Sequence, residues 1–141
     1  MIIGIDPGSS SGGIAMIDEL NRAAAWKMPE TETDVMDLLE SFVDHGSTCY
    51  IEKVHSMPKQ GVASTFTFGK NYGFLLGVLR ALKIRTEHVT PQAWQKFLGC
   101  RSGGNKNITK AKAQELFPEL KITHAIADAL LIAEYGRRVS V

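Results

Sequence analysis

The first 17 residues of the chain, MIIGIDPGSSSGGIAMI, contain two apolar runs separated by a turn. The first run covers residues 1–6 and ends at Pro7-Gly8, and the second covers residues 12–17. Two short apolar runs on either side of a segment rich in Gly and Ser are typical of an antiparallel β-hairpin. The start of the chain therefore predicts two paired strands, with the carboxylate of Asp6 at the end of the first.

The rest of the chain predicts an α/β fold. Apolar periodicity, proline positions and capping residues indicate three further strands, at residues 23–28, 49–54 and 84–89. They indicate helices from Thr31 or Thr33 to His45, and at 64–82, 91–98, 109–117 and 123–138. This order predicts a central mixed five-stranded sheet with helices on both faces. With 141 residues, we expect a single domain over 1–141.

The helix expected at 64–82 contains glycines at positions 69, 73 and 77. Residues four apart lie on nearly the same face of a helix. Because glycine is unfavourable inside a helix, we expect a neighbouring helix or sheet to approach closely there.

Charge is strongly segregated along the chain, although the total is only +1. Residues 1–52 carry a net charge of −8, residues 53–112 a net charge of +10, and residues 113–141 a net charge of −1. A cationic block of this size favours a polyanion as partner, because binding phosphates releases condensed counterions. A solvated surface balanced in space by the acidic N-terminal part is the alternative.

Targeting and cysteine patterns indicate a cytoplasmic protein. The N-terminus lacks a basic segment followed by an apolar one, and no stretch approaches the roughly 20 apolar residues of a membrane span. Cys49 and Cys100 lack the close spacing of a zinc site or a disulfide framework, so we expect free thiols.

Three carboxylates stand out because apolar residues surround them. Asp6 and Glu52 lie near the ends of apolar strands, and Asp128 is the one acid in an apolar stretch of the last helix. His124 lies one helical turn before Asp128, so it belongs to the same face. Burying a carboxylate without a partner is costly, and such a set could hold one or two hard cations that activate water at a phosphodiester. Taken singly, each residue also has a structural explanation, such as a turn, an ion pair or a helix cap.

The ordered motifs resemble those of RuvC-like Holliday junction resolvases in the RNase H-like superfamily. The three signatures are Ile3-Gly-Ile-Asp6-Pro-Gly8, Ile51-Glu52-Lys-Val54 and Ala127-Asp128-Ala-Leu-Leu-Ile-Ala133. Two more segments, Val62-Ala-Ser-Thr-Phe66-Thr-Phe68-Gly-Lys70 and Val89-Thr-Pro-Gln-Ala-Trp94, resemble the short phage-type branch. The likeness spans nearly the whole chain in order.

The resemblance implies an RNase H-like fold and a homodimeric endonuclease that makes paired nicks in four-way DNA junctions. It implies that Asp6, Glu52 and Asp128 bind two Mg²⁺ or Mn²⁺ ions, that hydrolysis leaves a 5′-phosphate, and that the host is a bacterial or phage-infected cell. Members usually carry an acid three or four residues before the last aspartate, whereas this chain has His124 there. An imidazole can be a metal ligand or a general base, and it suits Mn²⁺ better than Mg²⁺.

The cationic block predicts DNA contacts. Six lysines are expected to contact phosphates without reading the base sequence, which suits recognition of DNA shape. For each of them, a position on a solvated surface is the alternative. They are Lys53, Lys59, Lys70, Lys106, Lys110 and Lys112. Four further side chains could stack on unpaired bases or wedge between them, namely His55, Met57, Phe66 and Phe68. At least one of the two phenylalanines is expected to pack in the core. Apolar faces near Phe74, Leu75 and Leu79 could form the dimer contact.

Three other functions are compatible with parts of the sequence. The glycine-rich start also resembles the phosphate loop of actin-like and sugar-kinase-like ATP-binding proteins, but those need two such domains, and 141 residues provide room for one. A nuclease of the same fold could act on flaps, nicked DNA or RNA–DNA hybrids, because fold does not fix substrate. A DNA-binding module without catalysis would have no need of the three carboxylates.

Overall fold

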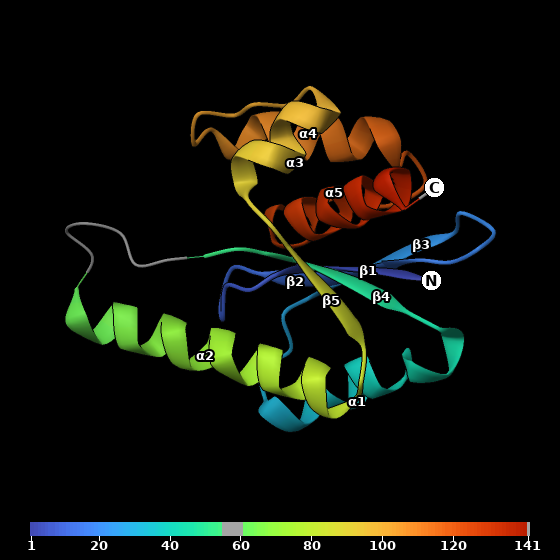
Figure 1. Ribbon diagram of the computed structural model, residues 1–141. Helices are drawn as coiled ribbons and strands as arrows, with labels where there is room; N and C mark the ends of the chain where they lie inside the picture. The colour runs from blue at the N-terminus through green and yellow to red at the C-terminus, as the bar shows by residue number, and fades with distance from the viewer. Residues whose placement is uncertain (55–60, 141) are drawn as a thin grey trace.

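A computed structural model describes residues 1–54 and 61–140 (Figure 1). Its strands are β1 (Ile2–Asp6), β2 (Gly13–Ile17), β3 (Ala23–Lys27), β4 (Thr48–Glu52) and β5 (Arg85–Val89). Its helices are α1 (Glu32–Glu40), the 3₁₀ turn η1 (Val43–His45), α2 (Val62–Ala81), α3 (Pro91–Leu98), α4 (Lys106–Leu116) and α5 (His124–Val139).

The strands form one five-stranded sheet in the order β3-β2-β1-β4-β5. Strand β2 is antiparallel to both β1 and β3, which confirms the expected hairpin, whereas β4 is parallel to β1 and β5 is parallel to β4. In chain order, α1 precedes β4, and α2 connects β4 to β5. The expected mixed α/β sheet is therefore confirmed.

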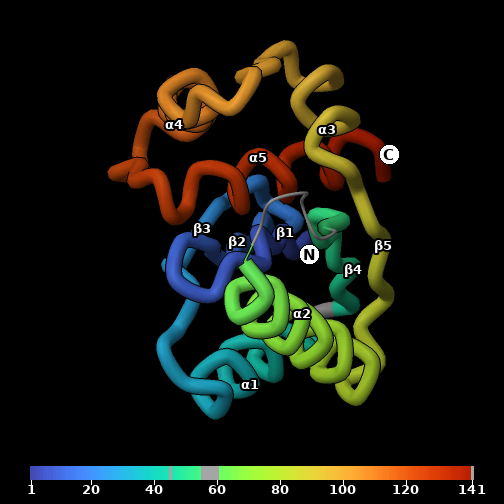
Figure 2. Tube along the Cα trace, turned by 90° about the vertical axis from the view of Figure 1, so that its left-hand side faces the viewer, coloured from blue at the N-terminus to red at the C-terminus, as the bar shows by residue number. Residues whose placement is uncertain are grey.

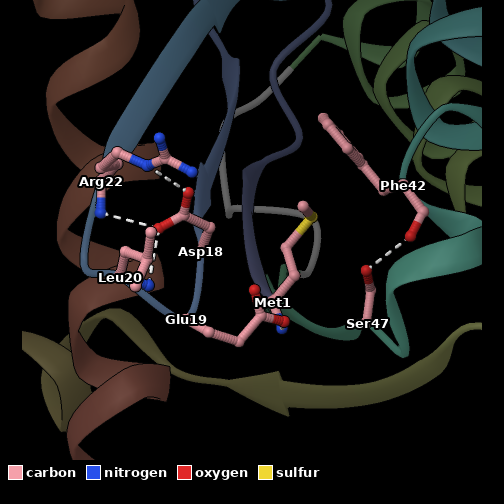
Figure 3. A network of polar contacts seen from close by, with 7 residues as sticks. All are labelled: Met1, Asp18, Glu19, Leu20, Arg22, Phe42 and Ser47. Atoms are coloured by element: carbon pink, nitrogen blue, oxygen red, sulfur yellow. Dashed lines mark hydrogen bonds and ion pairs between the residues drawn. The ribbon is translucent and has the colours of Figure 1, made fainter.

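The turn between β2 and β3 is closed by side-chain hydrogen bonds (Figure 3). The Asp18 carboxylate accepts hydrogen bonds from the backbone N–H groups of Leu20 and Arg22, each at 2.9 Å, and from the Arg22 side chain at 2.8 Å. The N-terminal ammonium group donates to Glu19 at 2.9 Å. Because Asp18 organises three donors, the turn is held by local chemistry.

Helices cover both faces of the sheet, as expected. Helices α3, α4 and α5 lie on one face, and α1 and α2 lie on the other (Figures 1 and 2). Each face has its own apolar core: the upper core includes Trp94, Leu130 and Leu131, and the lower core includes Leu39 and Leu75. Alternating residues of the strands contribute to both cores, since successive strand side chains point to opposite faces.

Two helix boundaries differ from the sequence-based prediction by more than two residues. Helix α1 ends at Glu40 rather than continuing to His45, because the chain turns there and places Phe42 in the lower core. Helix α4 begins three residues earlier than predicted, because the side chain of Asn105 caps it by accepting from the Asn107 N–H at 3.0 Å. Lys106 is therefore the first residue of a helix.

The expectation for the glycines of α2 is wrong. A Cβ added at Gly69, Gly73 or Gly77 would meet nothing within 4 Å, and all three positions are exposed. The opposite face of α2 packs on the sheet through Leu75, Val78 and Leu79. The glycines thus give α2 a smooth outer surface and do not serve packing within the chain.

Both cysteines, Cys49 and Cys100, are buried free thiols, as expected. Within residues 1–54 and 61–140, no helix combines the length and apolar character needed to cross a membrane.

Candidate active site

Two of the candidate carboxylates are placed together by strand register. Asp6 is the last residue of β1 and Glu52 is the last residue of β4. These strands are parallel neighbours with Ile5 opposite Ile51, so the residues that follow lie at the same end of the sheet. The carboxyl ends of adjacent parallel strands thus bring both acids to one edge.

Helix α5 brings the third carboxylate to the same edge. The helix crosses β1 and β2 where those strands carry glycine: a Cβ on Gly4 would overlap the backbone at Ala129 and Ala133, and one on Gly13 would overlap the Ala125 carbonyl. Only glycine permits so close an approach of helix and sheet. The glycines around Asp6 therefore have a structural role, because they place Asp128 beside the strand ends.

The loop after Asp6 is fixed from the other face of the sheet. The Asn71 side chain of α2 donates to the Pro7 carbonyl at 2.8 Å, and the Gly8 N–H approaches Asp6 Oδ1 at 3.5 Å. Asp6 thus lies in a segment that both helical layers constrain.

Burial and mutual repulsion make these groups reluctant to ionise. Burial, followed by the charge of Asp128, raises the pKa of Asp6 from 3.8 to about 6. Burial raises the pKa of Glu52 from 4.5 to about 7, and the charges of Asp6 and Asp128 add to this rise. Burial also raises the pKa of Asp128. Each pKa responds to a neighbouring carboxylate or to the same lysine, so the three acids form one electrostatic unit.

Three polar side chains act against this rise. The Trp94 indole N–H donates to Glu52 Oε2 at 2.8 Å and lowers the pKa of Glu52. The Thr109 hydroxyl lies near both the Lys106 carbonyl, at 3.3 Å, and the Asp128 carboxylate, which is the stronger acceptor. The ammonium group of Lys106 lowers the pKa of all three carboxyls. Lys106 is thus the cation placed to compensate this cluster.

A cavity of about 630 Å³ opens beside the carboxylates. Glu52 and Asp128 line it together with Lys106 and Thr109. The other lining residues come from α3 and the segment that follows it: Pro91, Gln92, Gln95, Arg101, Ser102, Gly103 and Gly104. Asp6 does not line the cavity, but its charge acts on Glu52, which does. The cavity therefore joins an acidic edge to a polar and cationic wall.

The structure brings together only some of the residues expected at the site. His124 is exposed at the start of α5, and its charge acts on Asp128. Of the lysines expected to contact DNA, Lys106 lines the cavity. Lys53 and Lys70 are exposed, Lys110 is half-buried, and Lys112 is half-buried beside Glu115 at 3.5 Å.

The side chains expected to contact unpaired bases or a second chain differ in their exposure. Phe66 is 72% exposed near the start of α2, and Phe68 is half-buried. Neither belongs to either core among the described residues, so the expectation that at least one packs there is wrong. His55, Met57 and Lys59 lie outside the described residues. Leu75 and Leu79 are buried against the sheet, so they cannot form a contact with another chain.

The donor set fits a hard divalent cation. Carboxylate oxygens are the ligands that Mg²⁺ prefers, and Mn²⁺ accepts an imidazole as well. Within the described residues, no group of three or more His, Cys, Asp or Glu side chains is close enough to form a complete metal site. Buried carboxylates repel one another, so a compact arrangement requires a compensating positive charge.

Sequence reasoning missed several residues at this site. The sequence shows Trp94 only as part of a motif, and Thr109 is a buried threonine that leaves no pattern in the sequence. Arg101 lies close to Gly103 and Gly104, and this proximity of a cation to a flexible turn is the sequence signal for it. Gln92 and Gln95 lie on one wall of the cavity through the helical phase of α3, which only the packing of that helix reveals.

The strand order, the mixed strand directions and the helices on both faces define an RNase H-like α/β fold. The chain is similar over nearly its whole length to solved structures of Thermus thermophilus RuvC. One has a TM-score of 0.60 at 15% identity, covering 99% of this chain and 96% of that chain. Another, in complex with a Holliday junction substrate, has a TM-score of 0.64 at 16% identity, covering 98% and 94%.

No model of a protein family and no curated protein matches the sequence. At 15–16% identity, the structural similarity shows the fold and leaves the activity to be argued from the site.

Proposed function

We propose that the protein is a metal-dependent endonuclease that makes paired nicks in four-way DNA junctions. The observation that carries this proposal is the convergence of Asp6, Glu52 and Asp128 at one sheet edge, beside a cavity that Arg101 and Lys106 also line. Buried carboxylates with raised pKa values are unfavourable for stability, and such groups cluster at functional sites. The similarity to a RuvC solved with a Holliday junction supports the choice of substrate.

In this proposal Asp6, Glu52 and Asp128 hold two Mg²⁺ or Mn²⁺ ions. His124 lies one helical turn before Asp128, beside this group of carboxylates. Bound divalent cations would supply activation of water and stabilisation of the leaving oxygen. The protein's own residues position these carboxylates: Trp94 and Thr109 hold Glu52 and Asp128 through hydrogen bonds. Lys106 provides a positive charge at the cavity wall, where the scissile phosphate of the DNA would lie.

His124 has a position suited to an auxiliary role. It is exposed one turn before Asp128, so it could reach a metal or a water without being buried. We expect His124→Ala to slow cleavage under single-turnover conditions more than it weakens junction binding. An unchanged cleavage rate would exclude His124 from the chemistry.

The DNA surface we propose surrounds the cavity. Lys106 and Arg101 line it, and Lys53 is exposed just after Glu52. The remaining lysines expected from the sequence, together with His55, Met57, Phe66 and Phe68, stay hypotheses for contacts with the junction. Among these, Phe66 is 72% exposed and so is available to an unpaired base.

A four-way junction has near two-fold symmetry, so paired nicks call for two active sites related by a matching axis. We propose a homodimer whose contact is the outer face of α2, which carries Gly69, Gly73 and Gly77. All three are exposed with open space beyond them, and such a surface lets two helices approach closely. Sedimentation analysis should give twice the chain mass, and Gly69→Arg should give the monomer.

The test compares cleavage of a labelled four-way junction, linear duplex, flap, nicked DNA and RNA–DNA hybrid, with Mg²⁺, Mn²⁺ or chelator. Symmetric, metal-dependent nicks in the junction alone, abolished by Asp6→Asn while binding persists, are expected. Cleavage of another substrate would support the metal site but contradict the resolvase activity, and the protein would then be a different nuclease of this fold. Binding without cleavage under any condition would contradict the nuclease.

A further inference from the structure

Trp94 links the upper core to the carboxylate cluster. It lies in α3, which Thr90 caps and Pro91 begins, and its side chain is completely buried. Its indole N–H donates to Glu52 Oε2 at 2.8 Å. A tryptophan is therefore held by the core at one end and by a candidate metal ligand at the other.

The Trp94 indole donates to a charged acceptor, which burial of an indole does not require. A buried indole N–H needs one hydrogen-bond partner, and a backbone carbonyl would satisfy it. Trp94 instead uses a carboxylate that lines the cavity. Because the ring is packed among upper-core residues such as Leu98 and Leu131, the direction of its N–H is fixed by the fold.

The consequence falls on Glu52, which has three side-chain torsions and stands at the end of β4. A single neutral donor restrains the carboxylate and leaves its negative charge in place, whereas a lysine or arginine would neutralise that charge. With Oε2 engaged by the indole, the other oxygen, Oε1, is left for a cation. Partners of this kind orient metal ligands, and their loss commonly costs 10- to 100-fold in metal affinity or activity.

We propose that Trp94 is a positioning residue that fixes the Glu52 carboxylate for a divalent cation, and that its fluorescence therefore reports occupancy of the site. This inference rests on the proposed metal-dependent function, which supplies the cation. It assigns a role to a residue that touches neither the substrate nor the cation. The core tryptophan thereby becomes a part of the active site.

The chain offers a matched control because it has two tryptophans. Trp26 lies on β3, packs against Phe42 at 5.8 Å between ring centroids, and is 37% exposed. Trp26→Phe leaves Trp94 as the sole indole, and Trp94→Phe leaves Trp26. Mn²⁺, which is paramagnetic and quenches nearby fluorophores, is the probe.

Adding Mn²⁺ to Trp26→Phe should quench the emission saturably, whereas Trp94→Phe should show no saturable change. Free Mn²⁺ measured by electron paramagnetic resonance should then show 10- to 100-fold weaker binding by Trp94→Phe than by Trp26→Phe. In a Glu52→Gln background, Trp94→Phe should cause little further loss, because the tryptophan acts through that carboxylate. A purely structural role would lower the melting temperature without this dependence on Glu52.

Equal Mn²⁺ affinities in the two phenylalanine variants would overturn the inference and leave the proposed nuclease intact. The quenching measurement does not need Trp94→Phe to fold, so Trp26→Phe that binds Mn²⁺ without quenching would also overturn it. If the unaltered protein bound no Mn²⁺ and cut no junction, the proposed function itself would fail.

Discussion

Replacing Asp6 by asparagine should stabilise the metal-free protein while abolishing cleavage. Burial and the charge of Asp128 raise the pKa of Asp6 in the folded chain to about 6, against 3.8 for an ordinary aspartate. At pH 8 the folded state therefore carries an ionised carboxylate that burial and the charge of Asp128 destabilise relative to an exposed aspartate. An amide removes that charge while keeping the shape and an oxygen acceptor for the Gly8 N–H.

The magnitude follows from the pKa difference. At pH 8 the ionised Asp6 destabilises the folded state by about 3 kcal/mol, because each tenfold change in proton affinity is worth about 1.4 kcal/mol. A raised carboxyl pKa means that stability is highest below pH 3.8 and is lost as the pH rises toward 6. The gain from Asp6→Asn should be about half as large at pH 5. In melting temperature it should be on the order of 10 °C at pH 8.

The assay is thermal and urea denaturation of both proteins with chelator at pH 5 and pH 8. Asp37→Asn is the control, because Asp37 is exposed on α1, and its effect should stay within about 0.5 kcal/mol. Excess Mg²⁺ should stabilise the unaltered protein and leave Asp6→Asn unchanged, because ligands that bind the folded state shift unfolding. Equal or lower stability of Asp6→Asn at pH 8 would refute the assignment of a buried, repelled carboxylate.

Further outcomes follow from the same geometry. Lys106→Ala should weaken junction binding and reduce the salt-dependence slope by about one, whereas Lys83→Ala, at the opposite end of the sheet, should not; equal slopes in filter binding would contradict this role. Gly4→Ala should cost about 1–3 kcal/mol in urea denaturation, because its Cβ overlaps the backbone of α5; a tolerated Gly4→Ala would argue against the close packing. Mn²⁺ affinity should rise between pH 5 and pH 8 as the carboxyls, including Glu52 with its pKa of about 7, lose their protons; calorimetry showing no pH dependence would argue against the carboxylates as ligands.

Local pattern was sufficient to predict the fold because the relevant signals are short-ranged. The hairpin at residues 1–17 follows from two apolar runs and a turn, and α3 follows from Thr90 and Pro91 at its start. Asp6 and Glu52 were identified because each interrupts an apolar strand at its end. Their meeting at one edge then followed from parallel strands, a pairing that the order of elements predicts.

Other features depend on where whole elements lie. Both Gly4 and Gly73 occur in apolar segments, yet one is required for contact with α5 and the other faces solvent. Sequence spacing gives the face of a helix that a residue occupies but not what lies opposite, so the prediction for α2 was wrong.

The active site shows the same division. The sequence by itself determined which acids lie in apolar surroundings, because the neighbouring residues show where a carboxylate would be buried at a cost in free energy. Only the tertiary structure decided that Trp94 donates to Glu52, that Thr109 supports Asp128 and that Lys106 stands beside all three acids. Hydrogen bonds and ion pairs act over a few ångströms in space, and residues 19 or more positions apart come within that range only after the helices have packed on the sheet.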